Sequence, residues 1–184
     1  MRIRPLSRSA YSSAGPETLR RAHGVQPVSV LQTEYFLFER GVEAEVLPAA
    51  RELGVGFVPY SPLGRGFLTS AVKPAEHYEE DNFRRHDARW KGENYRTNKR
   101  AVDRLNELAA EKGITAAQLA LAWLLAGGQD IVPIPGTRTA TRVEENLAAA
   151  DVELTEADLA RINEIVPDGA AGPRYTPEYM PTWV

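Results

Sequence analysis

Residues 130–146, DIVPIPGTRTATRVEEN, constrain the fold of this chain more than any other stretch. They predict a short apolar strand over 131–134, followed by a turn at 135–137. A helix then begins at Thr139 or Thr141. A turn that leads from a strand into a helix N-terminus binds phosphate readily, because unpaired backbone N–H groups and the helix dipole point at the anion. The alternative is an ordinary strand–helix unit with a solvated, charged helix face.

The two faces of this predicted helix differ in chemistry. Arg142, Glu145 and Asn146 lie three or four residues apart and therefore share one face. Val143 and Leu147 belong to the other face, which we expect to pack inward. The first face thus offers a cation, a carboxylate and an amide beside the phosphate-binding turn.

Composition excludes several classes of function. The chain has 184 residues, 43% of them hydrophobic and 26% charged, as in one soluble globular domain. It has no cysteine and only three isolated histidines, so we expect no disulfide, no metal site and no cysteine nucleophile. The net charge is -3 and the basic residues are dispersed, which argues against nucleic acid.

No apolar run is long enough to span a membrane, and the basic N-terminus lacks the apolar core of a secretory signal. We therefore expect a cytoplasmic protein that binds a small molecule, with no nucleic-acid or membrane partner.

Helical and strand patterns alternate along the chain, which predicts an α/β protein with about three parallel strands and flanking helices. Asn98 is expected to cap one helix, and Pro48 to bend another. The expected strands cover 28–32, 55–60 and 131–134. The expected helices cover 16–23, 42–53, 98–113, 116–126 and 155–166, in addition to the one after 139. Residues 1–15 read as irregular, 72–97 as a long loop with at most one short helix, and the tail after 166 as a surface segment.

Six segments carry a family signature: ETLRRAH (17–23), VLQTEY (30–35), EVLPAARELGVGFVPYSPLGRGFLT (45–69), NFRRHDARWKGEN (82–94), TAAQLALAWLL (115–125) and IVPIPGTRTATRVEENLAAADVELT (131–155). They resemble the C-terminal half of an aldo-keto reductase, a TIM-barrel oxidoreductase that uses NADPH. YSPLGRG is specific when combined with IPGT and the R-x-x-E-N that follows it. The resemblance implies a partial (β/α)8 TIM barrel, with residues 16–184 as the reductase domain and 1–15 as an irregular N-terminal segment.

The resemblance also implies an NADPH site. Gln32 matches the glutamine that hydrogen-bonds the nicotinamide carboxamide, a task that suits an amide with both a donor and an acceptor. Tyr60 matches the aromatic residue that stacks under the nicotinamide ring. For each of the two, the alternative is a structural role, as a polar strand end for Gln32 and as a buried tyrosine for Tyr60.

The phosphate and adenine contacts follow from the same match. The loop that wraps the pyrophosphate corresponds to Ser61, Pro62, Leu63, Gly64 and Arg65, where Gly64 would let the backbone approach closely. The turn that holds the adenosine 2′-phosphate corresponds to Ile134, Pro135, Gly136, Thr137 and Arg138, together with Arg142. An arginine there would favour NADPH over NADH, because its planar fork suits a phosphate. Glu145 and Asn146 match the residues that contact adenine.

Other side chains leave two readings open. Arg84 and Arg85 either touch substrate or cofactor or form a solvated charged pair. Trp90 and Trp183 either line the substrate mouth or pack on the surface.

The family's catalytic aspartate, tyrosine, lysine and histidine have no match in this sequence, so the resemblance assigns no catalytic residue here. By family, we expect an NADPH-dependent reductase of aldehydes and ketones whose catalytic half is missing from this chain, with a small-molecule carbonyl as substrate. The alternative is a catalytically inactive NADPH-binding or regulatory half-barrel that acts only with a partner. A partial barrel leaves strand edges uncovered, so we also expect self-association through exposed edges.

Overall fold

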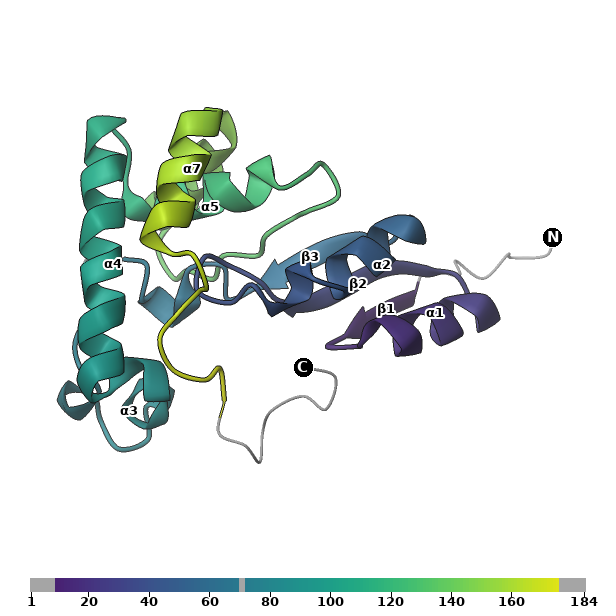
Figure 1. Ribbon diagram of the computed structural model, residues 1–184, viewed down its shortest axis with the longest axis horizontal. Coiled ribbons are helices and arrows are strands. Elements are labelled where there is room, and N and C mark those ends of the chain that lie inside the picture. The colour runs from purple at the N-terminus through teal and green to yellow at the C-terminus, as the bar shows by residue number, and fades with distance from the viewer. Residues whose placement is uncertain (1–8, 70–71, 176–184) are drawn as a thin grey trace.

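The computed structural model describes residues 9–69 and 72–175, and a parallel three-stranded sheet lies toward one end of it (Figure 1). The strands lie in the order β1 (Ser9–Ser12), β2 (Val28–Glu34) and β3 (Gly56–Tyr60). Helices α1 (Pro16–Val25) and α2 (Val46–Glu52) connect them and pack against each other. Because the strands are parallel, their carboxyl ends meet at one edge, where ligands bind in sheets of this kind.

Strand β1 falls inside the segment that the sequence predicted to be irregular. Its residues SAYS carry no apolar alternation, and three of the four are exposed. The strand forms through backbone pairing with β2, with Ser12 opposite Gln32. A pairing of this kind leaves no hydrophobic pattern to detect.

The expected strand over 131–134 is only partly formed. Ile131 makes an isolated parallel bridge with Phe57, and the Val132 N–H donates to the Phe57 carbonyl at 2.9 Å. Pro133 and Pro135 have no N–H, so the side of this segment that faces away from β3 lacks donors at both positions. Toward β3, the Ile134 N–H donates to the Pro59 carbonyl at 3.2 Å, but Pro59 has no N–H to donate in return, so the pairing does not extend into a full strand.

The expected helix over 42–53 is divided in two. A 3-10 turn covers Gly41–Glu43, and α2 begins only at Val46. Pro48 lies in the first turn of α2, where a backbone N–H has no partner within the helix. Pro48 therefore fits into the first turn of α2 without bending the helix.

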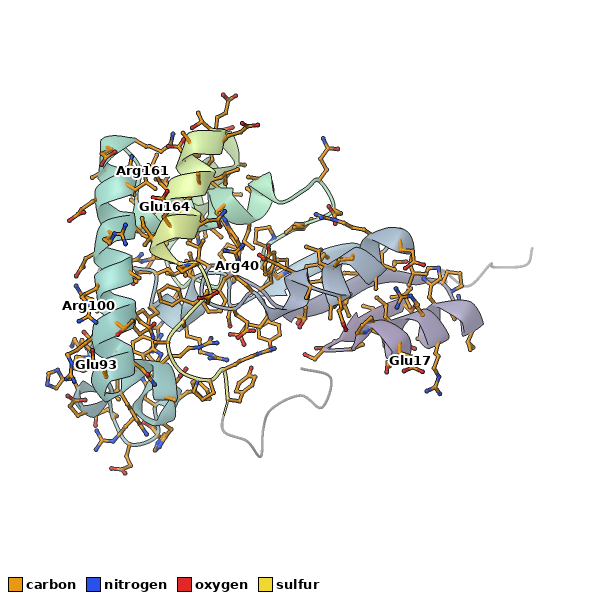
Figure 2. All side chains as sticks on the ribbon, in the orientation of Figure 1. Glu17, Arg40, Glu93, Arg100, Arg161 and Glu164 are labelled. Carbon is orange, nitrogen blue, oxygen red and sulfur yellow. The ribbon has the colours of Figure 1, made fainter. Side chains whose placement is uncertain are left out.

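Four further helices pack together beyond the carboxyl end of β3 (Figure 1). These helices are α4 (Gly92–Glu111), α5 (Ala116–Ala126), α6 (Ala140–Leu147) and α7 (Glu156–Ile165). The helix α5 is buried over most of its length, as its apolar sequence predicted. The capping boxes of α5 and α7 also form, through Thr115 with Gln118 and through Thr155 with Asp158. Charged side chains such as Glu93 and Arg100 project outward from α4 (Figure 2).

The expected loop over 72–97 is folded. It contains α3 (Phe83–His86) and two 3-10 turns, Ala75–His77 and Ala88–Trp90, before α4 begins at Gly92. Asn98 is therefore no helix cap. It is 2% exposed inside α4, and its Nδ2 donates to the Arg89 and Ala171 carbonyls at 3.1 and 2.9 Å.

The positions of several aromatic and apolar side chains differ from those that the sequence predicted. Trp90 is 2% exposed and packs edge-on against Phe67, with 4.6 Å between ring centroids, so it lines neither a substrate mouth nor the surface. Trp183 lies outside the described residues. Val143 and Leu147 of α6 are 45% and 69% exposed rather than packed inward.

The C-terminal segment, residues 167–175, lies for the most part at the surface, as predicted, but it is hydrogen-bonded to the body of the protein and buries Arg174. The Ala170 N–H donates to the Phe38 carbonyl at 3.0 Å, and the Ala171 N–H to Asn98 Oδ1 at 2.8 Å. Arg174 near its end is 3% exposed. Among the residues that the structure describes, no helix has the length and apolar character needed to cross a membrane.

Candidate functional site

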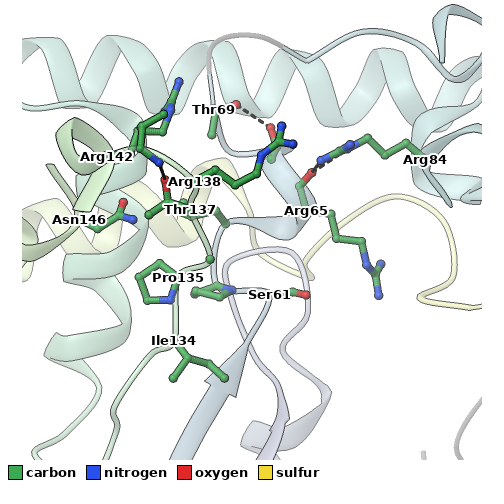
Figure 3. A pocket seen from close by; sticks show the side chains of 15 residues that line it. Ser61, Arg65, Thr69, Arg84, Ile134, Pro135, Thr137, Arg138, Arg142 and Asn146 are labelled. Carbon is green, nitrogen blue, oxygen red and sulfur yellow. Dashed lines mark hydrogen bonds between the residues drawn. The ribbon is translucent and has the colours of Figure 1, made fainter. Parts of the chain in front are cut away.

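An open cleft of about 680 Å³ lies where the carboxyl end of β3 faces the N-terminus of α6 (Figure 3). Two segments far apart in sequence, 61–69 and 134–146, supply nearly all of its lining. The volume is in the range of small-molecule and cofactor sites. The cleft brings together most of the residues that the sequence singled out: Ser61, Pro62, Leu63, Arg65, Ile134, Pro135, Gly136, Thr137, Arg138, Arg142 and Asn146.

The cleft is positively charged. Arg65, Arg84, Arg138 and Arg142 line it, and no carboxylate is among the lining side chains of the described residues. Arg142 is exposed, and its nearest acidic partner, Glu145, lies 3.8 Å away between Nη1 and Oε2. A concave surface with charge of one sign concentrates ligands of the opposite sign. The cleft is therefore suited to an anion.

Sequence reasoning missed several cleft residues. Gly66, Thr69 and Thr139 line it, and Thr69 Oγ1 donates to the Gly66 carbonyl at 2.8 Å. The signal for these residues lay in the motif itself, since two of them continue the SPLGRG turn and Thr139 precedes α6.

Arg84 also lines the cleft, and it is not part of a solvated charged pair. Its Nε and Nη2 donate to the Arg65 carbonyl at 2.8 and 2.5 Å. Arg85 donates to the carbonyls of Glu76 and Tyr78 at 3.1 and 3.0 Å. Both arginines thus brace loop backbone, and of the two only Arg84 borders the cleft.

The turn after β3 has unusual backbone geometry. Ser61 and Arg65 have φ values of 52° and 55°, in the left-handed region that non-glycine residues rarely adopt. Such strain gathers at functional loops. Gly64 also has a positive φ, but it is buried, and an added Cβ would lie 2.6 Å from Phe36 Cε2. Gly64 therefore allows the turn to pack on Phe36. The sequence had suggested instead that Gly64 lets the backbone approach a ligand in the cleft.

Thr139 is the N-cap of α6, which settles the choice between Thr139 and Thr141. Its N–H donates to Thr137 Oγ1 at 3.3 Å, but no side chain caps the N–H groups of the first turn. The helix N-terminus and the Ile134–Arg138 turn therefore present backbone donors at the edge of the cleft.

Tyr60, at the carboxyl end of β3, adjoins the cleft through Ser61 but does not line it. Its hydroxyl lies 3.1 Å from the Tyr175 hydroxyl and accepts a bond from Arg174. Burial, together with the bond to Tyr175, raises the pKa of Tyr60 to about 12. The phenol therefore stays protonated at neutral pH and is a poor proton donor to a substrate.

The sequence matches the model of the Aldo/keto reductase family over residues 7–167. The chain belongs to the aldo-keto reductase family. A probable aldo-keto reductase 1 from Glycine max is 44% identical over 165 residues, which cover 89% of this chain and 47% of that protein.

Solved structures of aldo-keto reductases and related dehydrogenases share the fold. A glycerol dehydrogenase from Gluconobacter oxydans aligns with a TM-score of 0.80 and 25% identity, covering 92% of this chain and 51% of the other. A thermostable aldo-keto reductase, solved with the inhibitor epalrestat, aligns with a TM-score of 0.59 and 26% identity, covering 84% and 46%. The chain thus forms part of a (β/α)8 barrel and spans about half the length of the relatives it matches.

Two further predicted residues of this aldo-keto reductase chain lie outside the cleft lining. Gln32 lies within β2, opposite Ser12 on one side and Val58 on the other, two residues before the end of the strand. Glu145 lies on α6, and its carbonyl accepts a bond from Gln118 Nε2 at 3.2 Å. Within the described part of the chain, no three histidine, cysteine or acidic side chains lie together as a metal site would require.

Proposed function

We propose that this chain binds NADPH along the cleft, as the cofactor-holding part of a reductase of aldehydes and ketones. The observation that carries the proposal is a cleft at the carboxyl end of the sheet whose lining includes two exposed arginines, Arg138 and Arg142, and no acidic residue among the described residues. A dinucleotide with three phosphate groups is a ligand of matching charge, and helix N-termini at such edges commonly hold phosphate.

Each part of the cofactor has a proposed place. The loop from Ser61 to Arg65 would hold the pyrophosphate. The turn 134–138 and Arg142 would hold the adenosine 2′-phosphate, with Glu145 and Asn146 beside the adenine. Gln32 and Tyr60 would receive the nicotinamide.

Arg65 would act through its backbone rather than its side chain. Its guanidinium lies 3.3 Å from Asp87 Oδ2, 3.4 Å from Glu34 Oε1 and 3.1 Å from the Tyr175 hydroxyl. Two carboxylates thus neutralise it. Among the cleft arginines, Arg138 and Arg142 are the exposed cations that suit the 2′-phosphate.

NADPH supplies a hydride to a carbonyl carbon when it is bound, and the resulting alkoxide needs a proton. We assign that proton to no residue of this chain, because the raised pKa of Tyr60 makes its phenol a weak acid and, by the family resemblance, the catalytic quartet has no counterpart in this sequence. We therefore propose that the chain alone binds the cofactor without turning it over. The alternative is an inactive NADPH-binding or regulatory half-barrel that acts with a partner.

The substrate class of the proposed reductase is a small alcohol or carbonyl compound. The name of the Gluconobacter relative, a glycerol dehydrogenase, supports this class.

The first test measures dissociation constants for NADPH and NADH by cofactor fluorescence. The chain should prefer NADPH, and Arg142→Ala should weaken NADPH binding by about tenfold while leaving NADH nearly unchanged, since only NADPH carries the 2′-phosphate. Arg161→Ala is the matched control, because Arg161 lies on α7 and pairs with Glu111 at 2.6 Å. Equal affinity for the two cofactors, or none for either, would overturn the assignment.

Self-association is a second proposal, supported by exposed apolar side chains on and beside the 131–134 segment. A cytoplasmic location remains a prediction.

A further inference from the structure

A buried carboxylate lies at the end of β2, and an arginine from the C-terminal segment neutralises it. Glu34 is 0% exposed and Arg174 is 3% exposed, and Arg174 Nε lies 2.5 Å from Glu34 Oε2. A buried carboxylate without a partner is strongly destabilising. The ion pair therefore accounts for the burial of an arginine from a segment otherwise rich in glycine and proline.

The same guanidinium holds the hydroxyl of Tyr60. Arg174 Nη2 donates to that hydroxyl, and the guanidinium carbon lies 5.7 Å from the centre of the Tyr60 ring. The Tyr175 hydroxyl lies 3.1 Å from the Tyr60 hydroxyl and accepts a bond of 3.1 Å from Arg65 Nη2. Two consecutive residues of the C-terminal segment thus hold the far end of the ring.

The path of the C-terminal segment is itself fixed, so Arg174 arrives in a defined place. Besides the bonds of Ala170 and Ala171 to the body, the Gly172 carbonyl accepts from Arg89 Nε at 3.3 Å. Gly172 has a φ of 97°, and an added Cβ would lie 2.7 Å from Asn94 Nδ2. A side chain at position 172 would therefore strain the segment, because the backbone there is left-handed and the Asn94 side chain would have to move.

We propose that Arg174 is a positioning residue for Tyr60, holding its ring in the orientation that the nicotinamide requires. The proposal rests on the proposed function, in which Tyr60 stacks against that ring. Orienting the ring before the ligand arrives removes part of the ordering cost of binding. Arg174 should therefore affect only the binding of the nicotinamide and not that of the phosphates, because Arg174 does not line the cleft that would hold the phosphates.

The test compares NADPH with 2′-phospho-ADP-ribose, which has the same phosphates and adenine but no nicotinamide. Tyr60→Phe keeps the aromatic ring and the Glu34–Arg174 ion pair but removes the hydroxyl that Arg174 holds. We expect the dissociation constant for NADPH to rise about threefold to tenfold, because the ring loses the charge-assisted hydrogen bond from Arg174 and the bond with the Tyr175 hydroxyl, with little change for 2′-phospho-ADP-ribose. Tyr35→Phe is the matched control, since it removes a tyrosine hydroxyl that donates to Glu43 at 2.9 Å instead.

Variants of the C-terminal segment test Arg174 directly. Arg174→Met alone leaves the buried Glu34 with only the longer contact to Arg65 at 3.4 Å, so it should be made together with Glu34→Gln, which removes both charges of the Glu34–Arg174 pair. Gly172→Ala strains the left-handed backbone of the segment while keeping Arg174. The double variant and Gly172→Ala should each reproduce the selective loss of NADPH affinity. Neither should weaken NADPH binding further when combined with Tyr60→Phe, because their effect passes through the Tyr60 hydroxyl.

The two ligands separate failure of this inference from failure of the proposed function. If the unaltered chain binds neither ligand, the cofactor assignment itself is wrong. If it binds both but Tyr60→Phe weakens both equally, or neither, Arg174 has only a structural role and the inference is overturned.

Discussion

Among single residues, Gly64 and Gly113 share a left-handed backbone but differ in what surrounds them. Their φ values are 57° and 70°, yet an added Cβ meets Phe36 Cε2 at 2.6 Å from Gly64 and nothing within 4 Å from Gly113. Alanine at either site incurs the left-handed backbone cost of about 1–2 kcal/mol. Gly64→Ala should lose about 1–3 kcal/mol more, because the Phe36 ring has to move. Urea denaturation of both variants measures the difference, and equal losses would show that the turn relaxes around the added methyl.

Between elements, the carboxylate of Asp158 is one of the links between α7 and the end of α4, beside the Arg161–Glu111 pair. Asp158 accepts from Lys112 Nζ at 2.7 Å and from the Thr155 N–H at 2.9 Å, and these bonds lower the pKa of Asp158 to about 2 from its ordinary 3.8. Since the folded-state pKa lies below the unfolded one, the carboxylate stabilises the folded chain above about pH 4, and this contribution is lost as the pH falls toward about 2.

Asp158→Asn should therefore lower stability at neutral pH and flatten the acid side of the stability curve. Urea midpoints measured from pH 7 down to the acid limit test this. Asp103→Asn is the control, because Asp103 pairs with Lys99 on an exposed face of α4. An unchanged slope below pH 4 in Asp158→Asn would mean that other carboxylates dominate acid unfolding.

The sequence predicted those elements whose structure depends on residues close to one another in the chain. The capping boxes at Thr115 and Thr155 and the apolar helix α5 form as expected, because their partners lie within four residues. The two halves of the cleft were also found, each as a contiguous motif, and the structure adds that they face each other. Contacts between distant residues left no such signal. Asn98 reads as a helix cap by its residue type, yet its partners are Arg89 and Ala171.

The C-terminal segment shows the same limit most clearly. Its prolines and glycines predict a surface coil, and only the tertiary partner of Arg174, 140 residues earlier at Glu34, explains its burial. Strand β1 was missed for a related reason, since Tyr11 is 39% exposed and the strand depends on backbone pairing alone.

For the molecule as a whole, one apolar surface stands out. Val132, Ile134, Val143 and Leu147 are 45% to 69% exposed, and three of them border a groove of about 320 Å³ between α5, α6 and the 131–134 segment. Exposed apolar patches of this kind mark interaction sites. Pro133 and Pro135 remove outward backbone donors, so contact through side chains should outweigh strand pairing at this edge.

We therefore expect the chain to self-associate through this surface, with a sedimentation coefficient that rises with protein concentration. Leu147→Lys should abolish the rise, because it places a charge in the patch at a position already 69% exposed, where the fold tolerates it. Val25→Lys is the matched control, since Val25 is 89% exposed at the end of α1. If the unaltered chain sediments as a monomer at every concentration, the patch has no role between copies. If Val25→Lys also abolishes the rise, added charge alone and not the patch governs association.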